Sequence, residues 1–415
     1  MYRKYSCEST NFVIKKKKNS TKSTNSTNRT KKNIRKCNTN SINNNNNMNI
    51  FYKNIVIKRN IINNIRIDKQ NPKKAFTQNI LKIQQEFYID ENYKDNYDET
   101  IENWIKDTNS YKVGESTYTG KKPTSSTRNY DDDYIFSVNK NDLIIQNYLK
   151  KVRMPYERYL ISAMSAYMPS NGIMLDIGTN IGTVAIPMSR ANKGVVVFAF
   201  EPFRQNYATL LKNIEDNETY NIVPLPVAVG DKPRDLVTLS TSILKIDKKE
   251  AHRVDIPKNN NNTKFNFGAI QLGNDGDKVK MISIDSLNLD YDVMKVDIEG
   301  AEPLAFYGAQ ESIKRCMPII AFEHNANSVT PDMRESLHIS DEIADFNIVK
   351  YCNSLGYNKI YEIPGDNFIL VPQKHYKLSK QLGHFIPSKN KSKFKGFSQE
   401  ELEGYELFEF VEPKW

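Results

Sequence analysis

One apolar run near the middle of the chain ends in a carboxylate and continues directly into two glycines four residues apart. In GIMLDIGTNIGT, residues 172–183, Asp176 precedes Gly178, Asn180 and Gly182. Glycines let a backbone turn approach a bound ligand closely, and the amino end of a following helix favours negative charge. These residues therefore indicate a ligand site at the end of a strand.

The acid in this turn restricts which ligand fits. A dinucleotide-binding turn would read G-x-G-x-x-G, whereas Gly178 and Gly182 give G-x-x-x-G with Asp176 two residues ahead. A carboxylate there would face a pyrophosphate badly, but it suits a ligand with a cationic centre and an amino acid group, as in S-adenosylmethionine. Asp176 would accept hydrogen bonds from the turn or from the ammonium group of that ligand. The alternative is that Asp176 only caps the next helix.

Further acids follow three other apolar runs. Glu201 follows VVVFAF, 25 residues after the first acid, where a carboxylate can accept both hydroxyls of a ribose. Asp297 and Glu299 follow YDVMKV, and Glu323 and His324 follow IIAF. Four runs thus end in polar or ionisable groups.

Strand and helix patterns alternate around these positions. Apolar runs of strand length occur at 172–178, 194–202, 221–231, 291–300, 317–325, 358–365 and 366–373, and helical patterns separate most of them at 183–191, 204–217, 301–316 and 340–357. Strands that are apolar throughout and alternate with helices are typical of a parallel sheet covered on both faces. The fold class is therefore α/β with one doubly wound domain, and ligands in such sheets lie beyond the carboxyl ends of the strands.

The chain divides into four parts. We expect a disordered basic tail over 1–75, a helical extension and polar linker over 76–129, the α/β domain over 130–375 and a C-terminal tail over 376–415. In detail, the patterns predict two amphipathic helices in 76–106, a linker in 107–129, polar turn-rich material in 231–278 and a short helix capped by Ser398 with Glu401 near the C-terminus.

The positive charge of the chain belongs to its first part. Residues 1–75 hold 19 Lys and Arg against 2 acids, and 18 Asn, whereas residues 76–415 hold 40 basic and 47 acidic side chains. Lys/Asn codon bias explains such a tail most simply, and non-specific contact with nucleic acid or an acidic surface is the functional alternative. An organelle-targeting segment fits less well, because such segments favour Arg and amphipathic spacing.

The sequence lacks features that several classes of protein require. Cys7, Cys37, Cys316 and Cys352 are scattered without a CxxC pair, which disfavours structural zinc and a disulfide framework. No stretch reaches the roughly 20 apolar residues that a membrane span requires. We therefore expect a soluble, cytoplasmic protein.

Five segments of the chain together resemble a known protein family. MLDIGTNIGTVAIPMS, VFAFEPFRQNYATLLKNIEDN, PLPVAVGD, ISIDSLNLDYDVMKVDIEGAEPLAFYGA and DNFILVP resemble, in order and spacing, the FkbM family of S-adenosylmethionine-dependent methyltransferases over about residues 130–373. KVDIEGAEPLAFYGA is the most specific piece, because the family carries an Asp-x-Glu-Gly-Ala-Glu run on its fourth strand and the following helix.

The resemblance implies a Rossmann-like, seven-stranded methyltransferase sheet, mostly parallel with its last strand antiparallel. It implies O-methylation of a hydroxyl, often on a sugar or polyketide-type metabolite. By position, the cofactor-binding residues would be Asp176, Gly178, Asn180 and Gly182 at the methionine part, Glu201 at the ribose, and Pro202 and Ala228 beside the adenine. This sequence departs from the family in Thr179, in Phe-Gly-Ala at 267–269, and in an Asn-rich insertion at 258–266.

Methyl transfer from a sulfonium requires alignment of the two reactants and removal of the acceptor proton. We expect Asp297 to orient the acceptor or the methyl group, and Glu299 or His324 to act as the base. The alternatives are that Asp297 and Glu299 cap the helix that starts near Ala301, and that Glu323 and His324 are structural. Together these four side chains could also hold a divalent cation, but no metal is assigned.

The leading hypothesis is an S-adenosylmethionine-dependent O-methyltransferase that acts on a small molecule or glycan. The alternatives are an RNA methyltransferase tethered by the basic tail and a catalytically inactive binding protein with the same fold. An NAD-dependent oxidoreductase is more remote.

Overall fold

The computed structural model describes residues 65, 67, 68, 70–87, 102, 103, 105–114, 134–240, 266–324, 329–375, 385–391, 394 and 396–411. All of them belong to one compact unit, Ile50–Trp415. The tail expected over 1–75 lies mostly outside these residues. Within them, no helix is long and apolar enough to cross a membrane.

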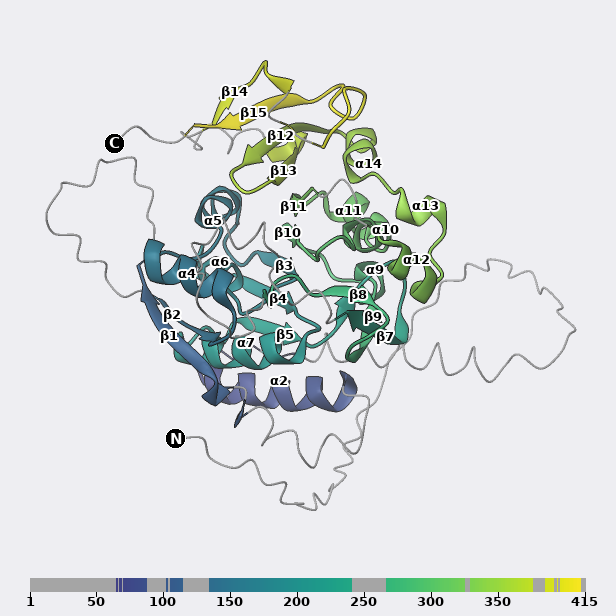
Figure 1. The fold of residues 1–415 in the computed structure, drawn as a ribbon. Coiled ribbons are helices and arrows are strands. Elements are labelled where there is room, and N and C mark those ends of the chain that lie inside the picture. Colours follow the sequence, from purple (N-terminus) through teal and green to yellow (C-terminus); the bar gives the residue numbers. More distant parts are fainter. Residues whose placement is uncertain are drawn as a thin grey trace, which may run out of the picture. The chain divides into compact units, whose positions relative to one another are not determined.

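A nine-stranded sheet forms the centre of the domain (Figure 1). Its order is β14-β15-β12-β13-β11-β10-β3-β4-β5. The strands are β3 (Ile173–Ile177), β4 (Val196–Phe200), β5 (Ile222–Leu225), β10 (Val293–Val296), β11 (Ile319–Glu323), β12 (Tyr357–Ile363), β13 (Asn367–Pro372), β14 (Phe385–Pro387) and β15 (Glu406–Phe410). The five strands from β5 to β11 are parallel, and β13 is antiparallel to both of its neighbours. The mostly parallel α/β sheet is thus present, but the expected seven strands are extended by two.

The two additional strands come from the predicted C-terminal tail. β15 pairs in parallel with β12, and β14 pairs antiparallel with β15. The hydrogen bonds expected between Ser398 and Glu401 are present in both directions, yet they close turns and no helix follows. Because Phe394 and Leu402 are buried in the core, this segment belongs to the domain.

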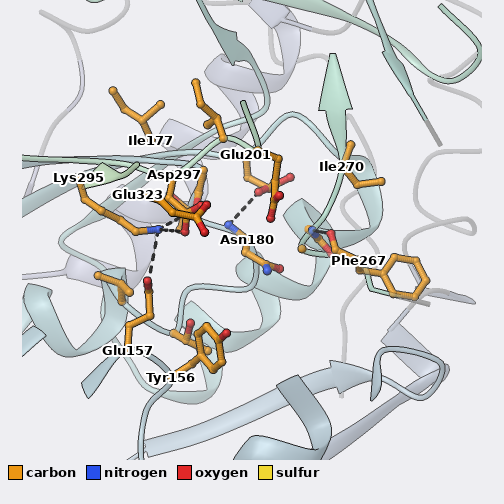
Figure 2. Close-up of a pocket in the computed structure, with 18 of the residues that line it drawn as sticks. Tyr156, Glu157, Ile177, Asn180, Glu201, Phe267, Ile270, Lys295, Asp297 and Glu323 are labelled. Carbon is orange, nitrogen blue, oxygen red and sulfur yellow. Dashed lines mark hydrogen bonds and ion pairs between the residues drawn. The ribbon is translucent and has the colours of Figure 1, made fainter. Parts of the chain in front are cut away.

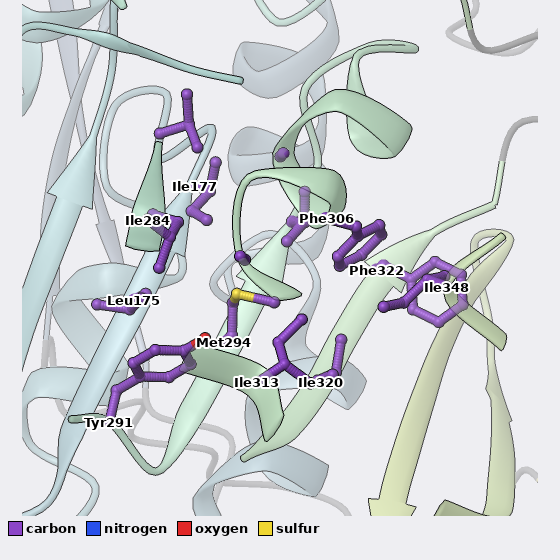
Figure 3. Packing of buried hydrophobic residues seen from close by; sticks show 14 of the residues in the cluster. Leu175, Ile177, Ile284, Tyr291, Met294, Phe306, Ile313, Ile320, Phe322 and Ile348 are labelled. Carbon is purple, nitrogen blue, oxygen red and sulfur yellow. The ribbon is translucent and has the colours of Figure 1, made fainter. Parts of the chain in front are cut away.

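Alternate side chains of the sheet enter two separate apolar layers, as the two-residue repeat of a strand requires. One layer receives Leu175 and Ile177, and Figure 3 shows them with Met294 and Ile320 of neighbouring strands. The helices on this side include α9 (Ile284–Leu287), α10 (Glu302–Tyr307), α11 (Gln310–Cys316) and α14 (Ile348–Ser354). The opposite layer receives Met174 and is covered by α4 (Leu143–Val152), α5 (Arg158–Ser165), α6 (Ala185–Ser189) and α7 (Arg204–Asp216).

The N-terminal extension contains one confirmed helix and one strand that the sequence analysis missed. α2 (Pro72–Phe87) begins at a proline, which suits a first helical turn, and buries Ile83 and Phe87 in the core. Part of the second expected helix lies outside the described residues. The polar segment predicted as a linker forms β1 (Thr108–Val113), which pairs with β2 (Tyr134–Asn139). Its polar side chains misled the prediction, because half of the residues of β1 are exposed and only Val113 is buried.

The polar stretch 231–278 also contains strands, so its interpretation as turn-rich material was wrong in part. β6 (Ala228–Val229), β7 (Arg234–Ser240), β8 (Gln271–Gly273) and β9 (Lys278–Ile282) form a separate four-stranded sheet. The helices expected at 301–316 and 340–357 are each divided, into α10 and α11 and into α13 (Asp341–Ala344) and α14. A further helix, α12 (Pro331–Leu337), packs beside the small sheet.

Asp142 connects α4 to the segment before β8. Its carboxylate accepts a hydrogen bond of 3.2 Å from the backbone N–H of Ile145, at the start of α4, and another from the backbone of Phe267. Burial raises the pKa of this carboxyl from 3.8 to about 7, although the backbone donors lower it. A group that binds its proton more tightly when folded makes stability depend on pH.

We therefore expect Asp142→Asn to reduce the loss of stability at alkaline pH. The contribution of Asp142 is fully present below about pH 4 and is lost as the pH rises through about 7. Between pH 5.5 and 8.5, the wild type should lose about 2 kcal/mol more unfolding free energy than the variant. Urea unfolding at both pH values measures this difference, and equal losses in the two proteins would contradict the assignment.

Candidate active site

A cavity of about 490 Å³ opens at the carboxyl ends of β3, β4, β10 and β11 (Figure 2). Further walls come from the α4–α5 connection, from residues 266–272 and from the β12–β13 turn. β3 lies between β4 and β10. The chain first extends the sheet from β3 through β4 to β5, and it later adds β10 and β11 on the other side of β3. Open α/β sheets bind their ligands at such a switch point.

Most of the residues selected from sequence meet in this cavity. Those that line it are Gly178, Asn180, Glu201, Pro202, Ala228, Asp297 and Glu299. Asp176, Gly182 and His324 are not among the lining residues.

The glycine turn brings β3 against the end of β10. Gly178 has φ +81°, and a Cβ atom there would lie 1.8 Å from the backbone oxygen of Asp297. Asn180 follows with φ 54°, and its side-chain Oδ1 is buried without a hydrogen-bond partner among the described residues. Gly182 serves packing instead, because its Cβ would overlap Leu210 of α7 at 2.7 Å. The turn thus offers backbone and one unsatisfied amide oxygen to a ligand.

Glu201 is held in place by the same turn. Its two carboxylate oxygens accept hydrogen bonds from the backbone N–H groups of Asn180 (2.8 Å) and Phe203 (2.9 Å). Figure 2 shows the first of these bonds beside the cavity. Burial raises the pKa of Glu201 to about 7, while the two backbone donors lower it. Each oxygen retains a second lone pair with which it can accept a ligand hydroxyl.

Pro202 and Ala228 also line the cavity. Leu239 and Phe267 line this region too, and the ring of Phe267 stacks on that of Phe203 at 5.9 Å. The side-chain amide of Asn206 donates to the backbone oxygen of Phe267 at 2.9 Å, which fixes the residue at which this sequence departs from the family.

Lys295 lies at the centre of the opposite end of the cavity. Its ammonium group is 3.0 Å from Asp297 Oδ2, 3.7 Å from Glu157 Oε2 and 3.9 Å from Asp176 Oδ1. Burial lowers the pKa of Lys295, but the three carboxylates outweigh this effect and raise it above its ordinary value. Lys295 is therefore a permanent cation, and Asp176 lies behind it, completely buried.

Glu323 and His324 point to opposite sides of the sheet, as consecutive residues at a strand end do. Glu323 lines the cavity, and burial followed by the charge of Asp297 raises its pKa above that of an ordinary Glu. His324 stacks on Phe397 with ring centres 4.0 Å apart. His324 does not line the cavity, and its position beside Phe397 argues against the predicted role as the base.

The Asp-x-Glu-Gly-Ala-Glu run forms the turn from β10 into α10. Glu302 accepts a hydrogen bond of 2.9 Å from the backbone N–H of Ile298 and thereby holds the turn. Asp297 is paired with Lys295, while Glu299 adopts φ 53° and lines the cavity. Glu302 is the first residue of α10, whose N-cap residue Ala301 makes no side-chain capping hydrogen bond, so Glu302 stabilises the turn before the helix. Among the described residues, no group of three or more His, Cys, Asp or Glu side chains is arranged to hold a metal ion.

Sequence reasoning missed Lys295, Glu157 and Tyr156, all of which line the cavity. A signal for Lys295 was present, because a lysine interrupts the otherwise apolar strand VMKV, and such a lysine is buried only with a partner. Nothing in the sequence marked Glu157 and Tyr156, which reach the cavity from the α4–α5 connection.

Residues 176–357 match the family model of the methyltransferase FkbM domain. Over these residues the chain is similar to methyltransferases of the FkbM family, a class of enzymes that use S-adenosylmethionine. Comparison with curated proteins gives no match.

Solved methyltransferases are similar to parts of the chain. Methyltransferase FkbM from Methylobacillus flagellatus KT is 19% identical over 50% of this chain and 47% of its own, with a TM-score of 0.29. Precorrin-6y C5,15-methyltransferase from Geobacter metallireducens GS-15 is 13% identical over 53% and 89%, with a TM-score of 0.26. A SAM-dependent methyltransferase from Aquifex aeolicus is 12% identical over 54% and 90%, with a TM-score of 0.27. The chain thus spans about half the length of the Methylobacillus protein.

The cavity fits the cofactor of this domain class. The close approach at Gly178 and the unsatisfied Asn180 oxygen suit the amino acid part, and the buried Glu201 suits a ribose. The acids that line the cavity, Glu157, Glu201, Asp297, Glu299 and Glu323, outnumber the cations Lys295 and Arg158. A positively charged ligand is therefore favoured.

Proposed function

We propose that this protein is an S-adenosylmethionine-dependent methyltransferase that methylates a hydroxyl group of a sugar, glycan or other small metabolite. One observation carries the proposal: a single cavity joins the Gly178 turn and Glu201 to the carboxylates of Asp297 and Glu323. The first pair has the chemistry to hold the donor, and the second can receive the proton of an acceptor hydroxyl.

When bound, S-adenosylmethionine supplies a methyl group on a positively charged sulfur. Transfer breaks the carbon–sulfur bond, forms a carbon–oxygen bond and moves the hydroxyl proton to a carboxylate, so that charge and atoms balance. Asp297 is held by Lys295 at 3.0 Å and is suited to orient the acceptor. Glu323, whose pKa burial raises, is suited to accept the proton near neutral pH.

Replacement of Glu201 tests donor binding. In Glu201→Gln an N–H group replaces one of the two oxygens that accept backbone hydrogen bonds. The Kd for S-adenosylmethionine should rise about 10- to 100-fold, the effect of removing a hydrogen bond to a charged group. Isothermal titration calorimetry measures this change.

Glu335→Gln, on the exposed surface of α12, is the matched control and should leave the Kd unchanged. The absence of detectable binding by folded wild-type protein would refute the proposed function.

The acceptor can be found by transfer of a labelled methyl group to cell-extract fractions, followed by mass spectrometry. We expect label in the glycan or small-molecule fraction. Label in RNA, with binding that weakens steeply as salt rises, would support a tethering role for the basic tail over 1–75. Donor binding without transfer to any fraction would favour a binding protein, and NAD binding would favour an oxidoreductase.

A further inference from the structure

Three carboxylates share one ammonium group at the transfer end of the cavity. Asp297 contacts Lys295 from the end of β10, Asp176 from β3, and Glu157 from the α4–α5 connection. Figure 2 shows Asp297 and Glu157 both directed at the lysine. The side chain of Lys295 is only 3% exposed, and that of Asp176 is not exposed at all. With all four groups ionised, this cluster carries a net charge of −2, which we call the Lys295 cluster.

Glu157 is held toward the cavity at some cost to the local backbone. It precedes α5 with φ 59°, a left-handed conformation unusual for residues other than glycine. Its side chain makes no capping hydrogen bond to α5. One carboxylate oxygen instead lies near Lys295, and the other accepts a hydrogen bond of 3.3 Å from Asn367. Strain of this kind is often retained where a side chain serves a ligand.

The cluster lies directly beside the part of the turn that suits the amino acid end of the donor. Lys295 donates a hydrogen bond of 3.4 Å to the backbone oxygen of Gly178, which lines the cavity. Asp176 also faces Lys295 across the β3–β10 ladder. Since buried charges are weakly screened, the cluster acts on any charge that a ligand brings to this end.

We propose that the Lys295 cluster makes the cavity prefer the positively charged methyl donor over its neutral product. This inference rests on the proposed function. S-adenosylmethionine and S-adenosylhomocysteine differ by one methyl group and by one positive charge on sulfur. A site with net charge −2 stabilises that charge and loses this attraction after transfer, so Glu157 and Lys295 determine specificity and promote product release.

Charge substitutions at Glu157 and Lys295 test the proposal through two Kd values, one for each ligand. We define the charge preference as the Kd for S-adenosylhomocysteine divided by that for S-adenosylmethionine. Glu157→Gln removes a negative charge and should lower the preference about tenfold, whereas Lys295→Met removes a positive charge and should raise it about tenfold. A tenfold change is about what we expect when one unit charge is removed about 10 Å from the sulfur charge, in an effective dielectric of about 20.

Both Kd values are measured by calorimetry at pH 8.5. At this pH the carboxylate of Glu157 is ionised, even though burial raises its pKa to about 7. The controls are Glu335→Gln and Lys350→Met, two charge changes at exposed positions, and neither should alter the preference. Opposite shifts of the preference in the two cluster variants identify a charge effect, because a loss of packing would weaken the binding of both ligands equally. Lys295→Met leaves three buried carboxylates without their cation; if it does not fold, Glu157→Gln decides alone.

The outcomes separate this inference from the proposed function. Wild-type protein that binds neither ligand overturns the proposed function and this inference with it. Binding of both ligands with an unchanged preference in Glu157→Gln overturns the role of the cluster and leaves the proposed function standing.

Discussion

Gly178→Ala should destabilise the protein by at least about 3 kcal/mol and abolish measurable binding of S-adenosylmethionine. The left-handed φ of +81° alone costs an alanine about 1 kcal/mol. The larger effect is steric, because the new Cβ would lie 1.8 Å from the backbone oxygen of Asp297. The turn and the end of β10 would have to separate. The free-energy cost of such a separation is similar to that of overpacking at other buried sites.

Gly356→Ala provides a matched control for this substitution. Gly356 also has a left-handed φ, +92°, but no atom of the part of the chain that the structure describes lies within 4 Å of the position its Cβ would take. It should lose only about 1 kcal/mol and should bind the donor as the wild type does. Urea unfolding and calorimetry on both variants measure these effects. Equal losses of stability would show that the contact with Asp297 is unimportant.

Glu323→Gln should lower the rate of methyl transfer about 100- to 1,000-fold while leaving the Kd for S-adenosylmethionine within about twofold. A glutamine keeps the shape of the side chain but cannot accept the hydroxyl proton, and general base catalysis typically contributes about 10²- to 10⁴-fold. Because the base must be ionised, the wild-type rate should fall as the pH drops below the raised pKa of Glu323. Single-turnover rates across the pH range, with the acceptor found in the fraction screen, measure both effects.

Glu299→Gln tests the competing assignment of the base. Glu299 also lines the cavity, but it lies on the turn after β10 rather than at the end of β11. Its rate should stay within about fivefold of wild type. A large loss in Glu299→Gln together with a small loss in Glu323→Gln would reverse the two roles.

Much of the main sheet could be predicted because its strands are apolar on both sides. β3, β4, β10 and β11 are almost completely buried, so each produced a continuous apolar run. β1 and β7 could not be found in this way, because polar side chains make up more than half of each strand. β15 was not predicted as part of the domain for another reason. Only its pairing with β12 in the folded structure makes the C-terminal segment part of the domain.

The cofactor end of the site was more accessible to sequence reasoning than the transfer end. Gly178, Asn180 and Glu201 lie within one continuous β-turn-α-β unit, where spacing along the chain translates directly into spacing in space. Glu157 reaches Lys295 from an element 138 residues earlier in the sequence, and no local pattern connects them.

The amino-acid sequence by itself determined the α/β class, the FkbM resemblance and the strand ends at which the acids gather, because these depend on burial patterns and short motifs. Only the tertiary structure decided which side of each strand end faces the cavity. The pleat directs Glu323 inward and His324 into the aromatic layer, and the packing of α5 on the sheet sets Glu157 against Lys295. The Lys295 cluster therefore depends on contacts between residues far apart in the sequence, and such contacts produce no periodic pattern in the chain.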